Sequence, residues 1–222
     1  HYVTVFKNAS SYITNTLLYA GIAATADVII GTAIAYIVLR TGVMGRKWLD
    51  YTSMGALAIP GVVLGIGYLR TFHDFQVPLV DKPLATWWVI IVIALTVRRL
   101  PYALRACMAA LQQLSVMLEE AAENLGATKA TTVRRIVVPL MSGGIMAGFI
   151  TSFATASVEL SATIMLVSNE SDAPLAAGIY ELMQSSAGRG PGAALGMVAV
   201  LIVGLGTYLS HRFIERSKHA RE

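Results

Sequence analysis

The sequence predicts an all-α polytopic membrane protein with about five transmembrane helices. Of its 222 residues, 55% are hydrophobic and only 14% are charged, whereas about 25% of residues are charged in a typical soluble domain. The mean hydropathy is +0.63, and several apolar runs reach the roughly 20 residues that a helix needs to cross a bilayer. Lysines and arginines are divided unevenly between the intervening loops, as expected where they fix the orientation of a membrane protein.

The spans follow from the apolar runs in chain order. A polar lead-in over residues 1–12 precedes the first span, which ends at Arg40. Pro60 and Gly61 predict a kink in the second span, because proline removes a helix hydrogen bond. We expect the five spans at about residues 13–39, 51–72, 84–99, 139–168 and 192–209.

The third span starts with Trp87 and Trp88, which suit a membrane interface. Its apolar run ends at Arg98 and Arg99, and the helix can continue past Arg105 into the elbow. The longest outer loop, 169–191, is expected to hold a short helix. Most of the 17 lysines and arginines fall on one side of the predicted spans. The positive-inside rule therefore places the loop after the third span and the C-terminus in the cytoplasm, and the N-terminus outside.

A polar elbow over residues 118–138 separates the third span from the fourth. Its first half has a helical pattern with small and apolar residues on one face, Leu118, Ala121, Ala122 and Leu125. The other face is polar and consists of Glu119, Glu120, Glu123 and Asn124. Gly126 predicts the end of this helix, because glycine adopts the left-handed conformation without steric cost. Pro139 then suits the first turn of the next helix.

The elbow resembles the EAA loop of ABC-importer permeases. The resemblance is carried by Glu120-Ala121-Ala122, by Gly126 after three intervening residues, and by Ile136-Val137-Val138-Pro139 after nine more. Val138 stands where that family usually has leucine, a conservative change. The resemblance implies a transmembrane permease subunit of a bacterial ABC importer in the inner membrane. It also implies that the elbow docks on a cytoplasmic ABC ATPase dimer. The coupling residues it implies are Glu119, Glu120, Ala121, Ala122, Leu125, Gly126, Ile136 and Pro139.

Two further segments resemble a narrower group. The stretch 157–164, SVELSATI, with Ile179-Tyr180 downstream, is similar to permeases for ferric iron and 2-aminoethylphosphonate, and Asn15-Thr16-Leu17 is similar to the start of the permease core. In the iron group two cores are often fused. We therefore expect residues 1–222 to form one permease domain, the C-terminal half of such a fused chain. The expected partners are a second core, fused or separate, and a periplasmic or extracellular solute-binding protein.

Two acidic residues inside predicted spans are candidates for a translocation pathway. An ionisable group in a span is costly and usually faces the bundle interior or a water-filled cavity. Glu159 falls on one stripe with Ser152, Thr155 and Thr163 at spacings of three and four. That stripe suits a polar pathway or an outer gate, and it equally suits packing between helices. For Asp27 packing is the favoured interpretation. The pathway candidates are Ser152, Thr155, Glu159, Ser161, Thr163 and Asp27.

The sequence gives no indication of catalysis by this chain. It has no GxxxxGK[ST] phosphate loop, HExxH or GxSxG motif, so ATP and magnesium are expected to act in the partner ATPase. The four histidines are scattered and the one cysteine, Cys107, excludes an internal disulfide, so we expect no metal or cofactor bound directly, and no nucleic acid. Two alternatives stay open. One is an ion-coupled secondary transporter or channel that uses Asp27 and Glu159, and the other is a membrane scaffold that only recruits a partner.

Overall fold

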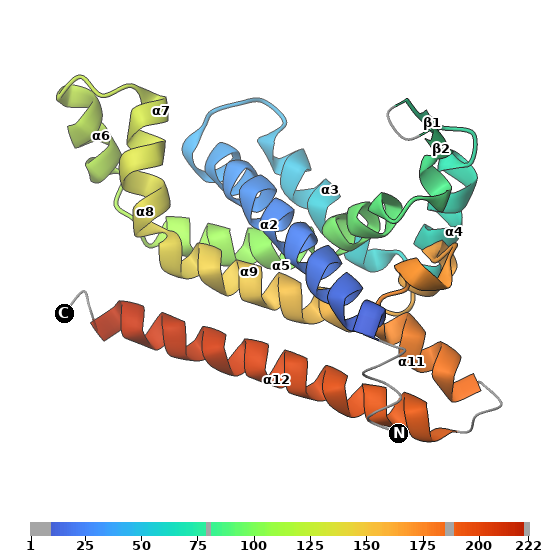
Figure 1. The fold of residues 1–222 in the computed structure, drawn as a ribbon. Helices are drawn as coiled ribbons and strands as arrows, with labels where there is room; N and C mark the ends of the chain where they lie inside the picture. The colour runs from blue at the N-terminus through green and yellow to red at the C-terminus, as the bar shows by residue number, and fades with distance from the viewer. Residues whose placement is uncertain (1–9, 79–80, 185–188, 220–222) are drawn as a thin grey trace.

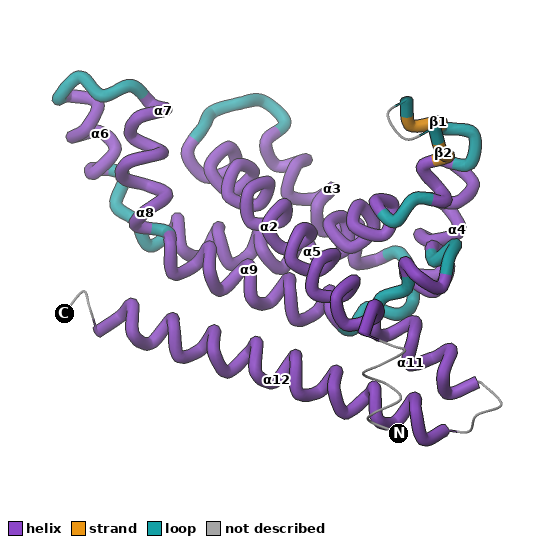
Figure 2. The backbone as a smooth tube through the Cα atoms, in the orientation of Figure 1, coloured by secondary structure: helices purple, strands orange, loops and turns teal. Residues whose placement is uncertain are grey.

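The protein, seen here in a computed structural model, is helical almost throughout the described residues, which are 10–78, 81–184 and 189–219 (Figures 1 and 2). The longer helices are α2 (Ser10–Arg40), α3 (Arg46–Ala58), α4 (Gly61–Phe72), α5 (Val89–Gln112), α9 (Ser142–Ser157), α11 (Leu175–Gln184) and α12 (Arg189–His219). The shorter ones are η1 (Leu84–Thr86), α6 (Met117–Asn124), α7 (Lys129–Thr132), the π-helix η2 (Val133–Val137), α8 (Val138–Leu140), α10 (Thr163–Leu166) and η3 (Glu170–Asp172). A two-stranded antiparallel hairpin joins β1 (Gln76–Val77) to β2 (Lys82–Pro83).

Helices α2, α5 and α9 pack against one another and form the centre of the bundle. Helix α12 lies along α9 and also packs on α11. The elbow helices α6, α7 and α8 lie at one end of the molecule, whereas α4, the hairpin and α11 lie at the other (Figure 1). The bundle thus has an elbow end and an opposite end.

Each end of the bundle has its own apolar core. At the elbow end, α5 contributes to a buried cluster of Ala35, Leu104, Cys107, Met108, Leu111, Val137 and Met141. Nearer the opposite end, Tyr19 stacks on Trp88 with ring centroids 5.4 Å apart, above the buried Ile90 and Ile91. Trp88, the residue before the first of α5, therefore anchors the start of this helix by packing within the bundle.

Two of the described helices, α2 and the 189–208 part of α12, are long and apolar enough to cross a membrane. Two bent pairs pass the same test together: α3 with α4, bent by 106°, and residues 129–140 with α9, bent by 69°. With α5 these elements correspond in order to the five expected spans. The kink predicted at Pro60 is confirmed as a sharp break.

The helix of the third span continues past Arg98, Arg99 and Arg105, as the sequence allowed, because α5 runs through Pro101 to Gln112. One expectation about the spans was wrong. The fourth span is not one continuous helix: α9 ends at Ser157, and residues 158–162 separate it from α10. The break in the fourth span and the middle of α5 meet in an ion cluster that is described below.

Candidate functional site

The elbow has the geometry that its glycine predicts. Gly126 has φ of 89°, in the left-handed region that glycine adopts without strain. The N–H of Ala127 donates to the carbonyl of Ala122 at 3.0 Å, which closes the end of α6. Thr128 then caps α7 by accepting a hydrogen bond from the N–H of Thr131 at 3.3 Å. The chain therefore reverses in a defined turn between α6 and α7.

Helix α6 leaves most of its apolar side uncovered. Leu125 is 90% exposed, Met117 73% and Leu118 46%, and Ala121 is exposed beside them. Glu120 is exposed on the same short helix. Exposed apolar side chains rimmed by charge are typical of a surface that binds another protein.

Glu119 does not lie on the outer face, contrary to the sequence prediction. Its side chain is buried, and its Oε1 accepts a hydrogen bond from Arg40 Nε at 2.7 Å. The hydroxyl of Tyr36 donates to Oε2 at 3.1 Å. Arg40 also donates to the carbonyls of Leu111 and Leu114, at 3.0 and 2.7 Å, and so caps the open end of α5. Glu119 thus fixes α6 to the ends of α2 and α5.

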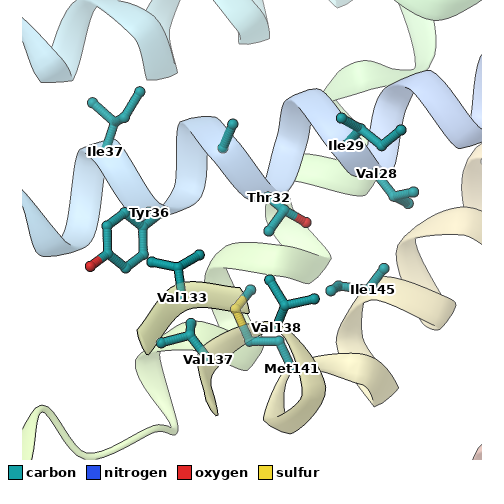
Figure 3. A pocket seen from close by; sticks show the side chains of 11 residues that line it. Val28, Ile29, Thr32, Tyr36, Ile37, Val133, Val137, Val138, Met141 and Ile145 are labelled. Atoms are coloured by element: carbon teal, nitrogen blue, oxygen red, sulfur yellow. The ribbon is translucent and has the colours of Figure 1, made fainter. Parts of the chain in front are cut away.

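A groove of about 540 Å³ separates α2 from the π-helix η2 and the start of α9 (Figure 3). One wall carries side chains of α2, including Thr32 and Tyr36, and the other carries Val133, Val138 and Ile145. Ile136 is half-buried and Pro139 exposed on the same part of the elbow. On this side, direct packing between α2 and the elbow is incomplete.

The second site is an ion cluster around Glu159, where α9 has ended and α10 has not begun. Its carboxylate accepts a hydrogen bond from Arg99, and Arg98 Nε lies 3.5 Å from Oε2. Oε1 accepts from Ser161 Oγ at 2.5 Å and from the N–H of Ala162 at 3.2 Å. Glu159 thus accepts hydrogen bonds both from a side chain and from the backbone of this segment. The chain can therefore leave the helix here without a glycine or a proline.

Arg98 connects this cluster to the break between α3 and α4. Its Nη1 donates to the carbonyl of Ile59, the residue that ends α3, at 3.0 Å. Close contacts reinforce the junction, because a Cβ built on Gly65 would lie 2.9 Å from Cβ of Met165 and 3.0 Å from the carbonyl oxygen of Ala162. Two broken helices therefore meet at one point of α5.

The remaining predicted pathway residues fall into two groups. Ser152 donates a hydrogen bond to Asp27, both fully buried, and Oδ1 of Asp27 has no hydrogen-bond partner among the described residues. Thr163 is buried and donates to the carbonyl of Glu159 at 2.6 Å. Thr155 and Ser161 are half-buried. The predicted stripe of Ser152, Thr155, Glu159 and Thr163 is not formed on one helix, because α9 ends at Ser157 and α10 begins only at Thr163.

Sequence reasoning missed the arginines. The sequence predicts Arg40, Arg98 and Arg99 only as charges at the ends of spans, whereas each pairs with a carboxylate from a distant segment. Their position next to or within apolar runs was the available signal, since a charge there needs a partner. Among the described residues, no group of three or more histidine, cysteine, aspartate or glutamate side chains could hold a metal ion.

A family model described as "Binding-protein-dependent transport system inner membrane component" matches residues 27–219. The chain is 37% identical over 153 residues to the ferric transport system permease protein FbpB of Actinobacillus pleuropneumoniae, covering 69% of this chain and 22% of that protein. It is 35% identical over 175 residues to the putative ferric transport system permease protein FbpB 1 of Haemophilus influenzae, covering 79% and 26%. The chain therefore spans about a quarter of the length of these relatives.

The fold is similar to that of a solved structure, a chain of a bacterial ABC transporter involved in the import of the acidic polysaccharide alginate. The TM-score is 0.74 at 21% sequence identity, and the match covers 96% of this chain and 82% of that one. At this identity the similarity shows the shared fold.

Proposed function

This chain belongs to the family of binding-protein-dependent transport system inner membrane components, and from that premise we propose that it acts as the transmembrane permease subunit of an ABC importer. The family expected from the EAA-like elbow is confirmed. The observation that carries the functional proposal is the elbow itself. A short helix leaves its apolar side uncovered, and a left-handed glycine turns the chain at its end.

We propose that α6 docks in a groove of a cytoplasmic ABC ATPase dimer. Leu118, Ala121 and Leu125 would enter the groove, because burial of their apolar surface favours association. Glu120, exposed beside them, would face a basic residue of the ATPase. Ala122 and Glu119 face inward and hold the helix in place. Closure of the ATPase on ATP and magnesium would then move the elbow and the helices joined to it.

The proposed cargo is ferric iron, delivered from the opposite end by a solute-binding protein. Both FbpB relatives carry a ferric transport name, and neither carries the phosphonate name that the sequence left as the other choice. In this proposal the elbow end is cytoplasmic, and a second permease core completes the pathway.

Among the predicted pathway residues, the half-buried Thr155 and Ser161 are the ones we propose to line the path. Asp27 and Glu159 are both bound to side chains within the bundle, which supports a packing role. An ion-coupled transporter that uses these two carboxylates therefore gains no support from their contacts.

The test is purification of the chain from its native membranes together with whatever subunits accompany it. We expect an ATPase to co-purify, and we expect Gly126→Val to abolish ATP-driven uptake of radiolabelled ferric iron. Valine is strained at a φ of 89° and would turn α6 away from its partner. Gly67→Val, on an exposed helical position with open space around it, is the matched control. A chain that purifies alone and conducts ions in liposomes without ATP would refute the proposal.

A further inference from the structure

Helix α2 connects the two ends of the bundle without a break. Its 31 residues correspond to a length of about 46 Å at 1.5 Å per residue, more than the roughly 30 Å of a bilayer core. The neighbouring α3–α4 and α8–α9 pairs are bent by 106° and 69°. In Figure 1, α2 runs from the elbow end to the neighbourhood of α11.

The elbow end of α2 is joined to α6 by polar contacts. Among the described residues, Tyr36 and Arg40 supply the side-chain hydrogen bonds that join α6 to a membrane helix, and both bind Glu119. The side chains of Arg40 and Glu119 are 12% and 10% exposed, so water screens their attraction little. Since the adjoining groove leaves α2 and η2 incompletely packed, this contact is the stiff link between α2 and the coupling helix.

The other end of α2 is joined to the segment 170–175. Asn15 Nδ2 donates to the carbonyls of Ser171 and Ala173, at 2.7 and 3.1 Å. Thr16 Oγ1 accepts from the N–H of Leu175, the first residue of α11, at 2.6 Å. The hydroxyl of Tyr12 donates to Glu170 at 3.0 Å. Asn15 and Thr16 belong to the stretch that resembles the start of the permease core. In the structure they bind the backbone of the segment 170–175.

We propose that α2 is the element that transmits conformational change between the ATPase side and the delivery side, with Arg40 and Asn15 as its positioning residues. The inference rests on the proposed function, because it assumes that the elbow meets the ATPase. A continuous helix bonded at both ends carries a displacement along its axis, whereas a helix broken by about 100° absorbs it by bending. The buried Asp27–Ser152 contact in its middle ties α2 to α9, so the two helices move together.

The experiment measures the fluorescence of a probe in the segment 170–175 while the ATPase, which we propose to lie at the elbow end, is held closed. A fluorophore is attached at Ser171→Cys, an exposed position, in a Cys107→Ala background, which leaves this chain with a single cysteine. The complex, purified with its own subunits in nanodiscs, is trapped with ADP–vanadate. Trapping is expected to shift the emission of the wild-type complex, and Arg40→Gln is expected to reduce that shift roughly tenfold, within the usual range of coupling between sites.

The controls separate transmission from folding. Lys47→Gln removes an exposed charge in the first turn of α3 and should keep the full shift. Glu119→Gln, which leaves Arg40 its two carbonyl acceptors, should also reduce the shift, and this variant decides the matter if Arg40→Gln does not fold. A wild-type complex whose emission does not change on trapping with vanadate, or a folded Arg40→Gln or Glu119→Gln complex that shifts like wild type, would overturn the role of α2 while leaving the permease function in place. If no ATPase co-purifies with the wild type, both proposals fail together.

Discussion

Two glutamates bind arginines inside this molecule, and their surroundings differ in an instructive way. Glu159 lies where a membrane helix has unwound, and it binds Arg98, Arg99 and the backbone of the segment that follows. Glu119 lies on an intact helix and binds Arg40 at the edge of the bundle. In the first case the ion cluster replaces helix hydrogen bonds. In the second it fixes one finished helix against another.

The difference predicts which site the fold depends on. Around Glu159, two arginines and two helix breaks rely on one carboxylate. Around Glu119, the arginine retains two carbonyl partners if the carboxylate is lost. The Glu159 cluster therefore holds the bundle together, whereas the Glu119 contact positions the elbow.

The largest effect is expected from Glu159→Ala. It leaves the buried guanidinium group of Arg99 and the half-buried one of Arg98 without their counter-ion, and breaking a buried pair in this way costs roughly 3–5 kcal/mol. The free energy of unfolding in detergent measures it. Glu123→Gln, at an exposed position of α6, is the control. A loss within about 0.5 kcal/mol, as for an ordinary surface change, would mean that the cluster does not support the two breaks.

A smaller effect, confined to one region, is expected from Glu119→Gln. The charge is lost but an acceptor oxygen remains, so the cost should be about 1–3 kcal/mol, the range for a hydrogen bond to a charged group. Hydrogen exchange should become faster in α6 and stay unchanged in the centre of α5. Equal acceleration in both helices would show that Glu119, too, supports the whole bundle, and the contrast between the two sites would disappear.

The smallest effect on stability is expected from Glu120→Gln. The side chain is exposed, so unfolding should change by no more than about 0.5 kcal/mol. Binding should respond instead, with less ATPase retained on purification because the outward charge is gone. Retention equal to wild type would remove Glu120 from the proposed docking surface. Glu119 and Glu120 would then differ in burial, but Glu120 would have no binding role of its own.

The sequence predicted those features whose causes are local. Gly126 ends α6, and Pro60 breaks the second span, because backbone geometry at each point depends on the residue that occupies it. The break at 158–162 was missed since it contains neither glycine nor proline, and its cause, Arg99, lies 60 residues away. The inward position of Glu119 was missed for the same reason, because its partner lies 79 residues away and helical spacing alone assigned it to the polar face.

The bend at Ile59 and Pro60 also has a consequence for biosynthesis. The carbonyl of Ile59 receives its hydrogen bond from Arg98, which the ribosome adds 39 residues later. The partner of Arg99, Glu159, is added 60 residues after it. Helices α3 to α5 are therefore made before Glu159 exists, and the second span, already broken at Pro60, is joined to the complete ion cluster only after the fourth span has been made. We therefore expect membrane insertion of this chain to keep the early helices together until the late ones are made, rather than release them one at a time into lipid.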